Sequence, residues 1–388
     1  MNANLQAPAL LPTYTPYPFP LLRGEGDRVF DPLGNAYWDF YGGHCVASTG
    51  HSHPRVADAV AAQAKELIFY STAAELPVRS RAAQELLAFT ASGRDTGLTS
   101  IFFCNSGAEA NENALKMACR ITGRKKFAAF QGGWHGRTLL ALSVTDDPPI
   151  TSPYEGLLAP CLRLAWNDLE ALEAADLSDV AGVILEPIQS MSGIRPATPE
   201  FLRALRAKTL AQGALLIYDE VQTGVGRLGH PYAAGLHGVK PDIVTSAKGL
   251  ASGVPMGAIL LGSETAACIR PGDLGSTFGG GPVACAALIA TLQVIRQEGL
   301  LQNALAREAQ IRAALAGTCV TEVKGSGLLL GLKAPGRAKA LKARLQERRI
   351  LVGGSSDPDV LRLMPPLTLT PAAVDALAGE VARFTKEN

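Results

Sequence analysis

Residues 100–121 read SIFFCNSGAEANENALKMACRI, and this stretch decides the fold. Its first five residues form a short apolar run that predicts a buried strand. A turn of small residues, Asn105-Ser106-Gly107, follows, and apolar residues then recur at helical spacing as far as residue 121. A buried strand that leads directly into an amphipathic helix is typical of a parallel sheet covered by helices. The stretch therefore predicts an α/β fold.

The same alternation extends along most of the chain, and beyond residue 300 it changes to an α+β pattern. We expect an N-terminal arm and small-domain segment at 1–50 and a large domain with a mostly parallel central sheet at 51–298. Residues 299–388 should form a smaller α+β domain, to which the N-terminal segment also contributes. The further expected strands are 126–130, 182–185, 214–218, 243–246 and 258–261, and the further expected helices are 79–91, 169–174 and 200–211.

Composition excludes several classes of partner. The chain carries 36 Lys and Arg against 35 Asp and Glu, so it has no broad charge excess for nucleic acid or an anionic membrane. Seven cysteines without a C-x-x-C pair indicate reduced thiols rather than a disulfide framework. The N-terminus lacks the basic region of a signal peptide, and the apolar stretch at 283–295 is too short to span a bilayer. We expect a soluble, cytoplasmic protein with no nucleic-acid or membrane partner.

Polar residues follow the predicted strands where a ligand site is expected, at the carboxyl ends of the sheet. After strand 100–104, Ser106, Gly107 and Ala108 begin a helix, whose free N–H groups and dipole suit a phosphate. An ordinary capped turn is the alternative. After strand 126–130 come Trp134 and Arg137, an aromatic plane that can stack on a ring and a guanidinium that can bind a carboxylate. Packing and surface charge are the alternatives for this pair.

Two charged residues follow the next strands. Asp219 ends a buried strand, where a carboxylate needs a cation such as a protonated ring nitrogen; a structural ion pair with a nearby arginine is the alternative. Lys248 stands among Ser, Ala, Gly and Leu, where desolvation would lower its pKa and make it a nucleophile and base, although a lone lysine is more often a surface residue. A glycine run at 224–229 matches the dinucleotide fingerprint formally, but no helix follows it. Together the four groups predict pyridoxal 5'-phosphate, a planar cationic ring with a phosphate, bonded to a lysine.

Six motifs carry a family resemblance that covers about residues 24–366. In order and spacing they resemble the class III (ω-amino acid) aminotransferases of fold type I, and among these the acetylornithine aminotransferases. The motifs are NSGAEANENALKMA at 105–118, WHGRT at 134–138, EPIQ at 186–189, DEVQTGVGR at 219–227, SAKGL at 246–250 and GSTFGG at 275–280.

The resemblance implies roles for the residues that match these motifs. Lys248 would bond to pyridoxal 5'-phosphate, Asp219 would keep the ring nitrogen protonated, and Gln222 would lie near the ring hydroxyl. Trp134 stands where relatives usually have Phe and would stack on the ring. The phosphate-binding residues would be Ser106, Gly107, Ala108 and, from the other subunit, Thr277.

The resemblance also implies a reaction and an assembly. The ω-amino group of an acylated diamino acid, in first place N-acetylornithine, would pass to 2-oxoglutarate, giving a semialdehyde and glutamate. Arg137 and Arg362 would bind substrate carboxylates, and Ser276 would reach the substrate from the partner subunit of a homodimer with composite sites. The alternatives are N-succinylornithine, a carrier-linked lysine or 4-aminobutyrate as donor, and a non-catalytic regulator that binds the cofactor.

One departure affects the expected substrate. Relatives usually read EPIQGEGG, and this chain reads EPIQSMSG, so that Met191 replaces a glutamate that pairs with the arginine at position 362. An arginine without that partner favours a second carboxylate or an acyl group over free ornithine.

Three histidines, His44, His51 and His53, cluster early in the chain, and their irregular spacing favours a packing or pocket-wall role over metal binding.

Overall fold

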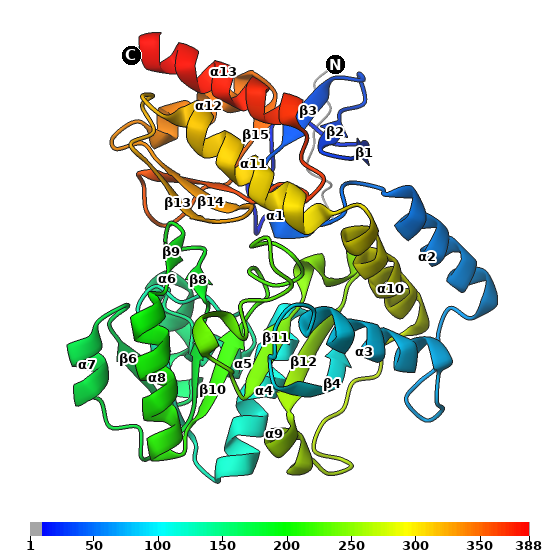
Figure 1. Ribbon diagram of the computed structural model, residues 1–388, viewed down its shortest axis with the longest axis vertical. Helices are drawn as coiled ribbons and strands as arrows, with labels where there is room; N and C mark the ends of the chain where they lie inside the picture. Colours follow the sequence, from blue (N-terminus) through cyan, green and yellow to red (C-terminus); the bar gives the residue numbers. More distant parts are fainter. Residues whose placement is uncertain (1–9, 388) are drawn as a thin grey trace.

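The computed structural model describes residues 10–387, so the first nine residues of the predicted arm lie outside it. A seven-stranded sheet with the order β4-β12-β11-β10-β7-β5-β6 lies in the lower half of the molecule in Figure 1. Only β12 runs opposite to the other six strands of this sheet, so the predicted mostly parallel α/β fold is confirmed. The strands are β4 Leu98–Cys104, β5 Lys126–Phe130, β6 Cys161–Leu164, β7 Val180–Leu185, β10 Leu215–Asp219, β11 Ile243–Ser246 and β12 Gly257–Gly262.

Helices cover both faces of this sheet, which explains why the inner strands β7, β10 and β12 are almost entirely apolar. Ile217 in β10 packs into the cluster that contains the buried face of α4, whereas Leu216 and Tyr218 pack into the cluster that contains α3, α8 and α10. Alternate residues of one strand therefore enter different cores. The covering helices are α3 Pro77–Thr90, α4 Gly107–Thr122, α8 Pro199–Gln212 and α10 Pro282–Gln297, with the short α7 Leu169–Ala174 packed on α8.

Two smaller sheets lie above the large one in Figure 1. The first joins both ends of the chain, because β15 pairs parallel with β3 in the order β1-β2-β3-β15. The second has the antiparallel order β13-β14-β16, and α11, α12 and α13 lie beside these sheets. The domain boundaries at 50 and 298 stay a prediction. The elements are β1 Arg23–Glu25, β2 Arg28–Phe30, β3 Ala36–Asp39, β13 Glu322–Ser326, β14 Leu329–Lys333, β15 Ile350–Leu351, β16 Val360–Leu363, α11 Leu300–Leu315, α12 Ala338–Glu347 and α13 Pro371–Glu387.

The remaining elements are short connections, apart from α2. A 13-residue helix, α2, packs on α10, and α1 is a single turn next to the segment that carries Lys248. Within residues 10–387 no single helix is long and apolar enough to cross a membrane, although α10 and α11 together pass that test as a pair bent by 61°. The bounds are α1 Gly42–Cys45, α2 Pro54–Glu66, α5 Leu139–Ser143, α6 Pro148–Thr151, α9 Ser263–Ala267, β8 Ile188–Gln189, β9 Arg195–Pro196 and the 3-10 turns Ser152–Leu157, Leu236–Gly238 and Lys248–Ala251.

Candidate active site

A cavity of about 270 Å³ opens at the carboxyl ends of the central strands. It brings together seven residues that the sequence predicts for the site: Gly107, Ala108, Trp134, Arg137, Asp219, Gln222 and Lys248. Five further residues line it that the sequence analysis did not assign to the site: Asn111, His135, Gly136, Glu186 and Val221.

The start of α4 forms one wall of the cavity. Ser106 caps the helix, because its Oγ accepts a hydrogen bond from the backbone N–H of Glu109 at 3.2 Å. Gly107 lies so close to a neighbouring loop that a Cβ there would approach Val221 Cγ1 to 2.9 Å. The start of α4 therefore faces the cavity with the small residues Gly107 and Ala108, which leaves room for a phosphate group at the helix N-terminus.

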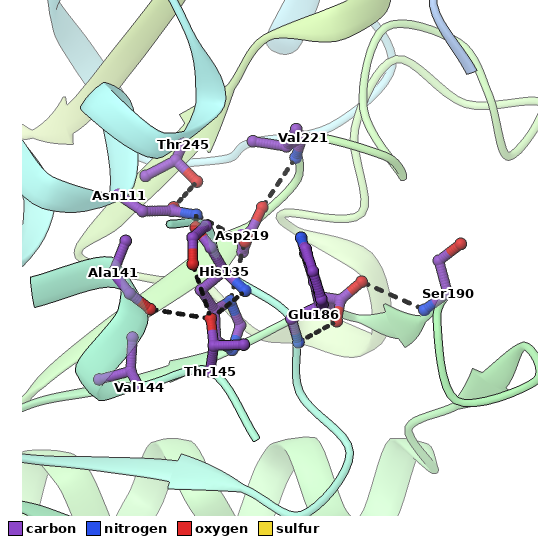
Figure 2. A network of polar contacts seen from close by, with 12 residues as sticks. Asn111, His135, Ala141, Val144, Thr145, Glu186, Ser190, Asp219, Val221 and Thr245 are labelled. Atoms are coloured by element: carbon purple, nitrogen blue, oxygen red, sulfur yellow. Dashed lines mark hydrogen bonds and ion pairs between the residues drawn. The ribbon is translucent and has the colours of Figure 1, made fainter. Parts of the chain in front are cut away.

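Asp219 lies in a buried network of polar contacts (Figure 2). Its Oδ2 accepts from His135 Nδ1 at 2.8 Å and from Asn111 Nδ2 at 2.7 Å, and its Oδ1 accepts from the N–H of Val221 at 3.1 Å. The side chain of Asn111 is held in turn by Thr245, whose Oγ1 donates to Asn111 Oδ1 at 2.7 Å. The carboxylate is only 4% exposed, so these contacts fix its direction at the cavity. Its side-chain partners among the described residues are thus a histidine and an asparagine, and not the arginine of the alternative interpretation.

Lys248 follows β11 and begins a short 3-10 turn. Burial lowers the pKa of its amine, and the nearby charges of Asp219 and Glu186 oppose this effect only in part. Its backbone adopts a left-handed φ of +46°, which costs a non-glycine residue free energy. No hydrogen bond or ion pair holds its Nζ among the residues that the structure describes. The amine is therefore free to react with a molecule in the cavity.

Trp134 and Arg137 lie at the cavity as a pair, with the guanidinium carbon 5.4 Å from the ring centroid. The backbone N–H of Trp134 donates to Glu186 Oε1 at 3.0 Å, and the N–H of Ser190 donates to Oε2 at 3.1 Å. Burial raises the pKa of Glu186 to about 7, although His135 counteracts it. Glu186 stands in the EPIQ motif and fixes the loop that carries the tryptophan, a role that the sequence alone does not reveal.

Arg362 lies next to the cavity but is not among the residues that line it. It is 4% exposed, and its Nη1 donates to Ser190 Oγ at 3.0 Å. Ser190 Oγ also lies 3.0 Å from Gln222 Oε1, so the arginine is connected to the cavity wall. No carboxylate forms an ion pair with Arg362 within residues 10–387, whereas the backbone oxygen of Met191 accepts from Ser356.

Ser276 and Thr277 do not reach the cavity of their own chain. Ser276 Oγ accepts from Asn105 Nδ2 at 3.2 Å and from the N–H of Gly279 at 3.0 Å, whereas Thr277 is exposed. Their assignment to a partner subunit's site stays a prediction.

The three early histidines have separate partners. His51 Nε2 lies 2.7 Å from Asp39 Oδ2, and His53 Nε2 lies 3.1 Å from Glu298 Oε1. His44 contacts the hydroxyl of Tyr41 through its ring nitrogens. Among the described parts of the chain, no three His, Cys, Asp or Glu side chains are grouped as metal ligands.

The donors and acceptors of the cavity fit one kind of molecule. An amine without a partner, a fixed carboxylate, an aromatic ring and a helix N-terminus face the same space. These groups match the aldehyde, the protonated ring nitrogen, the ring face and the phosphate of pyridoxal 5'-phosphate. Fold and site together define an enzyme of the fold type I aminotransferases.

Comparison with known proteins gives the family. Residues 11–384 match the class-III aminotransferases, and the chain belongs to that family. It is similar to the acetylornithine aminotransferases of Streptomyces coelicolor, at 46% identity over 93% of this chain and 89% of the relative, and of Methanopyrus kandleri, at 41% identity over 95% of each. The structure of ornithine aminotransferase from Toxoplasma gondii matches with a TM-score of 0.89 and 30% identity, over 98% of this chain and 92% of that one. Pyridoxal 5'-phosphate, which class-III aminotransferases use, partly occupies the active site of the Toxoplasma enzyme.

Proposed function

We propose that this chain transfers the ω-amino group of N-acetylornithine to 2-oxoglutarate and releases a semialdehyde and glutamate. The similarity to acetylornithine aminotransferases over nearly the full length carries this proposal. The cavity supports it, because a lysine with a buried amine, Lys248, and an arginine, Arg137, line it, and a second arginine, Arg362, is connected to its wall through Ser190.

Each group of residues in the cavity has a separate role in the proposed reaction. Pyridoxal 5'-phosphate, when bound, supplies a bond to the substrate nitrogen and an electron-withdrawing ring that acidifies the carbon carrying it. Lys248 acts as the base at that carbon, since burial lowers the pKa of its amine and makes the neutral form more available. Asp219, oriented by His135 and Asn111, holds a proton on the ring nitrogen. Ser106, Gly107 and Ala108 hold the phosphate at the start of α4.

Two arginines give the site its preference for carboxylates. Arg137 lies at the cavity wall beside Trp134 and binds the carboxylate far from the reacting amine. Arg362 is buried without a carboxylate partner in the described chain and binds the second carboxylate of 2-oxoglutarate. A free α-ammonium group near these cations would be repelled, and this favours an acylated donor over ornithine.

We also propose a cytoplasmic homodimer in which each subunit completes the other's site. Large apolar side chains are exposed around the end of α2 and on the GSTFGG segment, where Phe69 contacts Phe278, which is 65% exposed. Such a patch favours burial against a second copy. Thr277 stands next to this contact and would bind the partner's phosphate, with Ser276 towards its substrate. The exposed apolar residues of the patch are Leu67, Ile68, Phe69, Tyr70 and Phe278.

A donor panel tests the reaction. We expect glutamate to form from 2-oxoglutarate with N-acetylornithine, and at a lower kcat/KM with ornithine, N-succinylornithine, 4-aminobutyrate and a carrier-linked lysine. Lys248→Ala should lose turnover with every donor. Turnover with 4-aminobutyrate alone would contradict the acylated donor, and a wild-type protein that binds the cofactor without turnover of any donor would favour a regulator.

A further inference from the structure

Ser190 lies between the second arginine and the cavity wall. Its side chain is completely buried, and its Oγ contacts Arg362 Nη1 and Gln222 Oε1 at 3.0 Å each. Gln222 lines the cavity and is mostly buried. One hydroxyl therefore connects the arginine of the smaller sheet β13-β14-β16 with a residue that follows β10 of the large sheet.

The chemistry of these three groups decides which atom donates and which accepts in each of the two hydrogen bonds. A guanidinium only donates hydrogen bonds, so Ser190 Oγ must accept from Arg362. The hydroxyl hydrogen then goes to Gln222 Oε1, since among residues 10–387 the only other partner within reach is the weak acceptor Met364 Sδ at 3.8 Å. With its oxygen occupied, the amide of Gln222 is left with its NH₂ group to donate into the cavity. The charge of the arginine thus sets the orientation of the glutamine.

The arginine is held by neutral groups alone. Besides Ser190, the only hydrogen-bond partner of the guanidinium in the described chain is the backbone oxygen of Gly354, which accepts from Nε. Neither contact neutralises the positive charge, and Nη2 has no partner among these residues. The hydroxyl therefore orients the guanidinium and leaves it able to bind an anion.

We propose that Ser190 is a positioning residue that couples Arg362, which receives a substrate carboxylate, to Gln222, which donates to the ring of the cofactor. This inference rests on the proposed function and deepens it. The sequence carries the signal, because this serine and Met191 stand where relatives usually have Gly and Glu. In this chain a fixed neutral contact replaces an acidic partner, so the carboxylate site is available throughout the reaction.

The experiment compares Ser190→Ala with wild-type holoenzyme by two readouts. Calorimetric titration with glutarate, an unreactive five-carbon dicarboxylate, reports on the arginine, and the visible absorption band of the bound cofactor reports on the glutamine. We expect the Kd for glutarate and the KM for the keto acid acceptor to rise about tenfold, as for a lost hydrogen bond to a charged group. We also expect the band to shift.

Two further variants separate positioning from general damage. Ser192→Ala removes another hydroxyl of the same loop. This hydroxyl donates to the backbone oxygen of Gly132 and contacts neither Arg362 nor Gln222, so the variant should leave both readouts unchanged. Ser190→Thr keeps the hydroxyl and should restore both. Wild-type values in Ser190→Ala would overturn the inference, and so would weaker glutarate binding with an unshifted band, because the coupling would then be absent. Failure of the proposed reaction would appear separately, as wild-type protein that forms no glutamate.

Discussion

Lys248 combines two features that are unfavourable for a lysine, a left-handed backbone and a buried amine. Residues in such conformations persist only where the surroundings hold them, and they are concentrated at functional sites. The turn is held because Gly249 lies against Ser48, so closely that a Cβ at Gly249 would approach Ser48 Oγ to 2.0 Å. The packing of Ser48, which follows α1, on this turn thus holds the lysine at the cavity.

The lowered pKa of Lys248 predicts how the cofactor-free protein takes up pyridoxal 5'-phosphate. Only the neutral amine forms the covalent bond, and a lowered pKa makes that form abundant at lower pH. The rate of bond formation should rise with pH and level off below the ordinary lysine pKa of about 10.4. Stopped-flow absorbance measures this rate. A rate that still rises up to about pH 10.4 would show that burial does not lower the pKa of Lys248. As a control, Lys248→Ala should form no covalent bond with the cofactor.

Residues of the site could be predicted where a short motif carries the chemistry, and were missed where the partner is distant. The lysine, Asp219 and the α4 turn follow predicted strands, and all line the cavity. Asn111 and His135 were missed because their common partner lies 108 and 84 positions further along the chain. A signal existed for Asn111, since it lies one helical turn after Gly107 and so faces the same side of α4.

At the scale of single elements, α1 is the most unusual segment. Four consecutive residues, Gly42 to Cys45, have φ between +55° and +67°. Asp39 holds the turn, because its Oδ1 accepts from the N–H groups of Tyr41 and Gly42 at 2.8 and 2.9 Å. The left-handed backbone at Cys45 and His44 costs about 1–2 kcal/mol for each residue, which the contacts of the turn must offset.

Gly42 and Gly43 form a matched pair for testing this turn. A Cβ at Gly42 would lie 2.5 Å from the backbone oxygen of Met364, whereas a Cβ at Gly43 would meet nothing within 4 Å. Gly43→Ala should lower the free energy of unfolding by about 1–2 kcal/mol through its backbone alone. Gly42→Ala should lower it by about 3 kcal/mol or more, because backbone must also move. Urea unfolding of both variants measures the difference, and equal losses would mean that the contact with Met364 is unimportant.

Predicted elements coincide with observed ones where periodicity is strong. The strand expected at 243–246 and the helix expected at 169–174 have the bounds of β11 and α7. The edge strand β6 was missed because it is only half-buried and contains Arg163, whose guanidinium binds the backbone oxygens of residues 143–145. The antiparallel direction of β12 could not be predicted, since a strand buried on both faces has the same apolar pattern in either direction.

At the scale of the whole molecule, one chain contains an incomplete set of the expected site residues. The cavity has its lysine, its carboxylate and its helix N-terminus, but Thr277 lies on an exposed segment outside it. The apolar residues beside that segment, Phe69 and Phe278, offer a surface for a second copy. In the proposed homodimer, association through this surface would bury apolar area and at the same time bring a threonine to each partner's phosphate.

Subunit mixing tests this composite site. Lys248→Ala removes the reactive amine, and Thr277→Asp places a carboxylate where the partner's phosphate is expected, so each variant alone should be inactive. In a mixed dimer, the subunit with an intact lysine receives its threonine from the lysine variant, and one of the two sites is complete. Random mixing should therefore restore about a quarter of wild-type activity. The measurement is glutamate formation after co-refolding of the two variants, with sedimentation to establish the dimer. Mixtures as inactive as either variant alone, although dimeric, would mean that Thr277 serves no site across the interface.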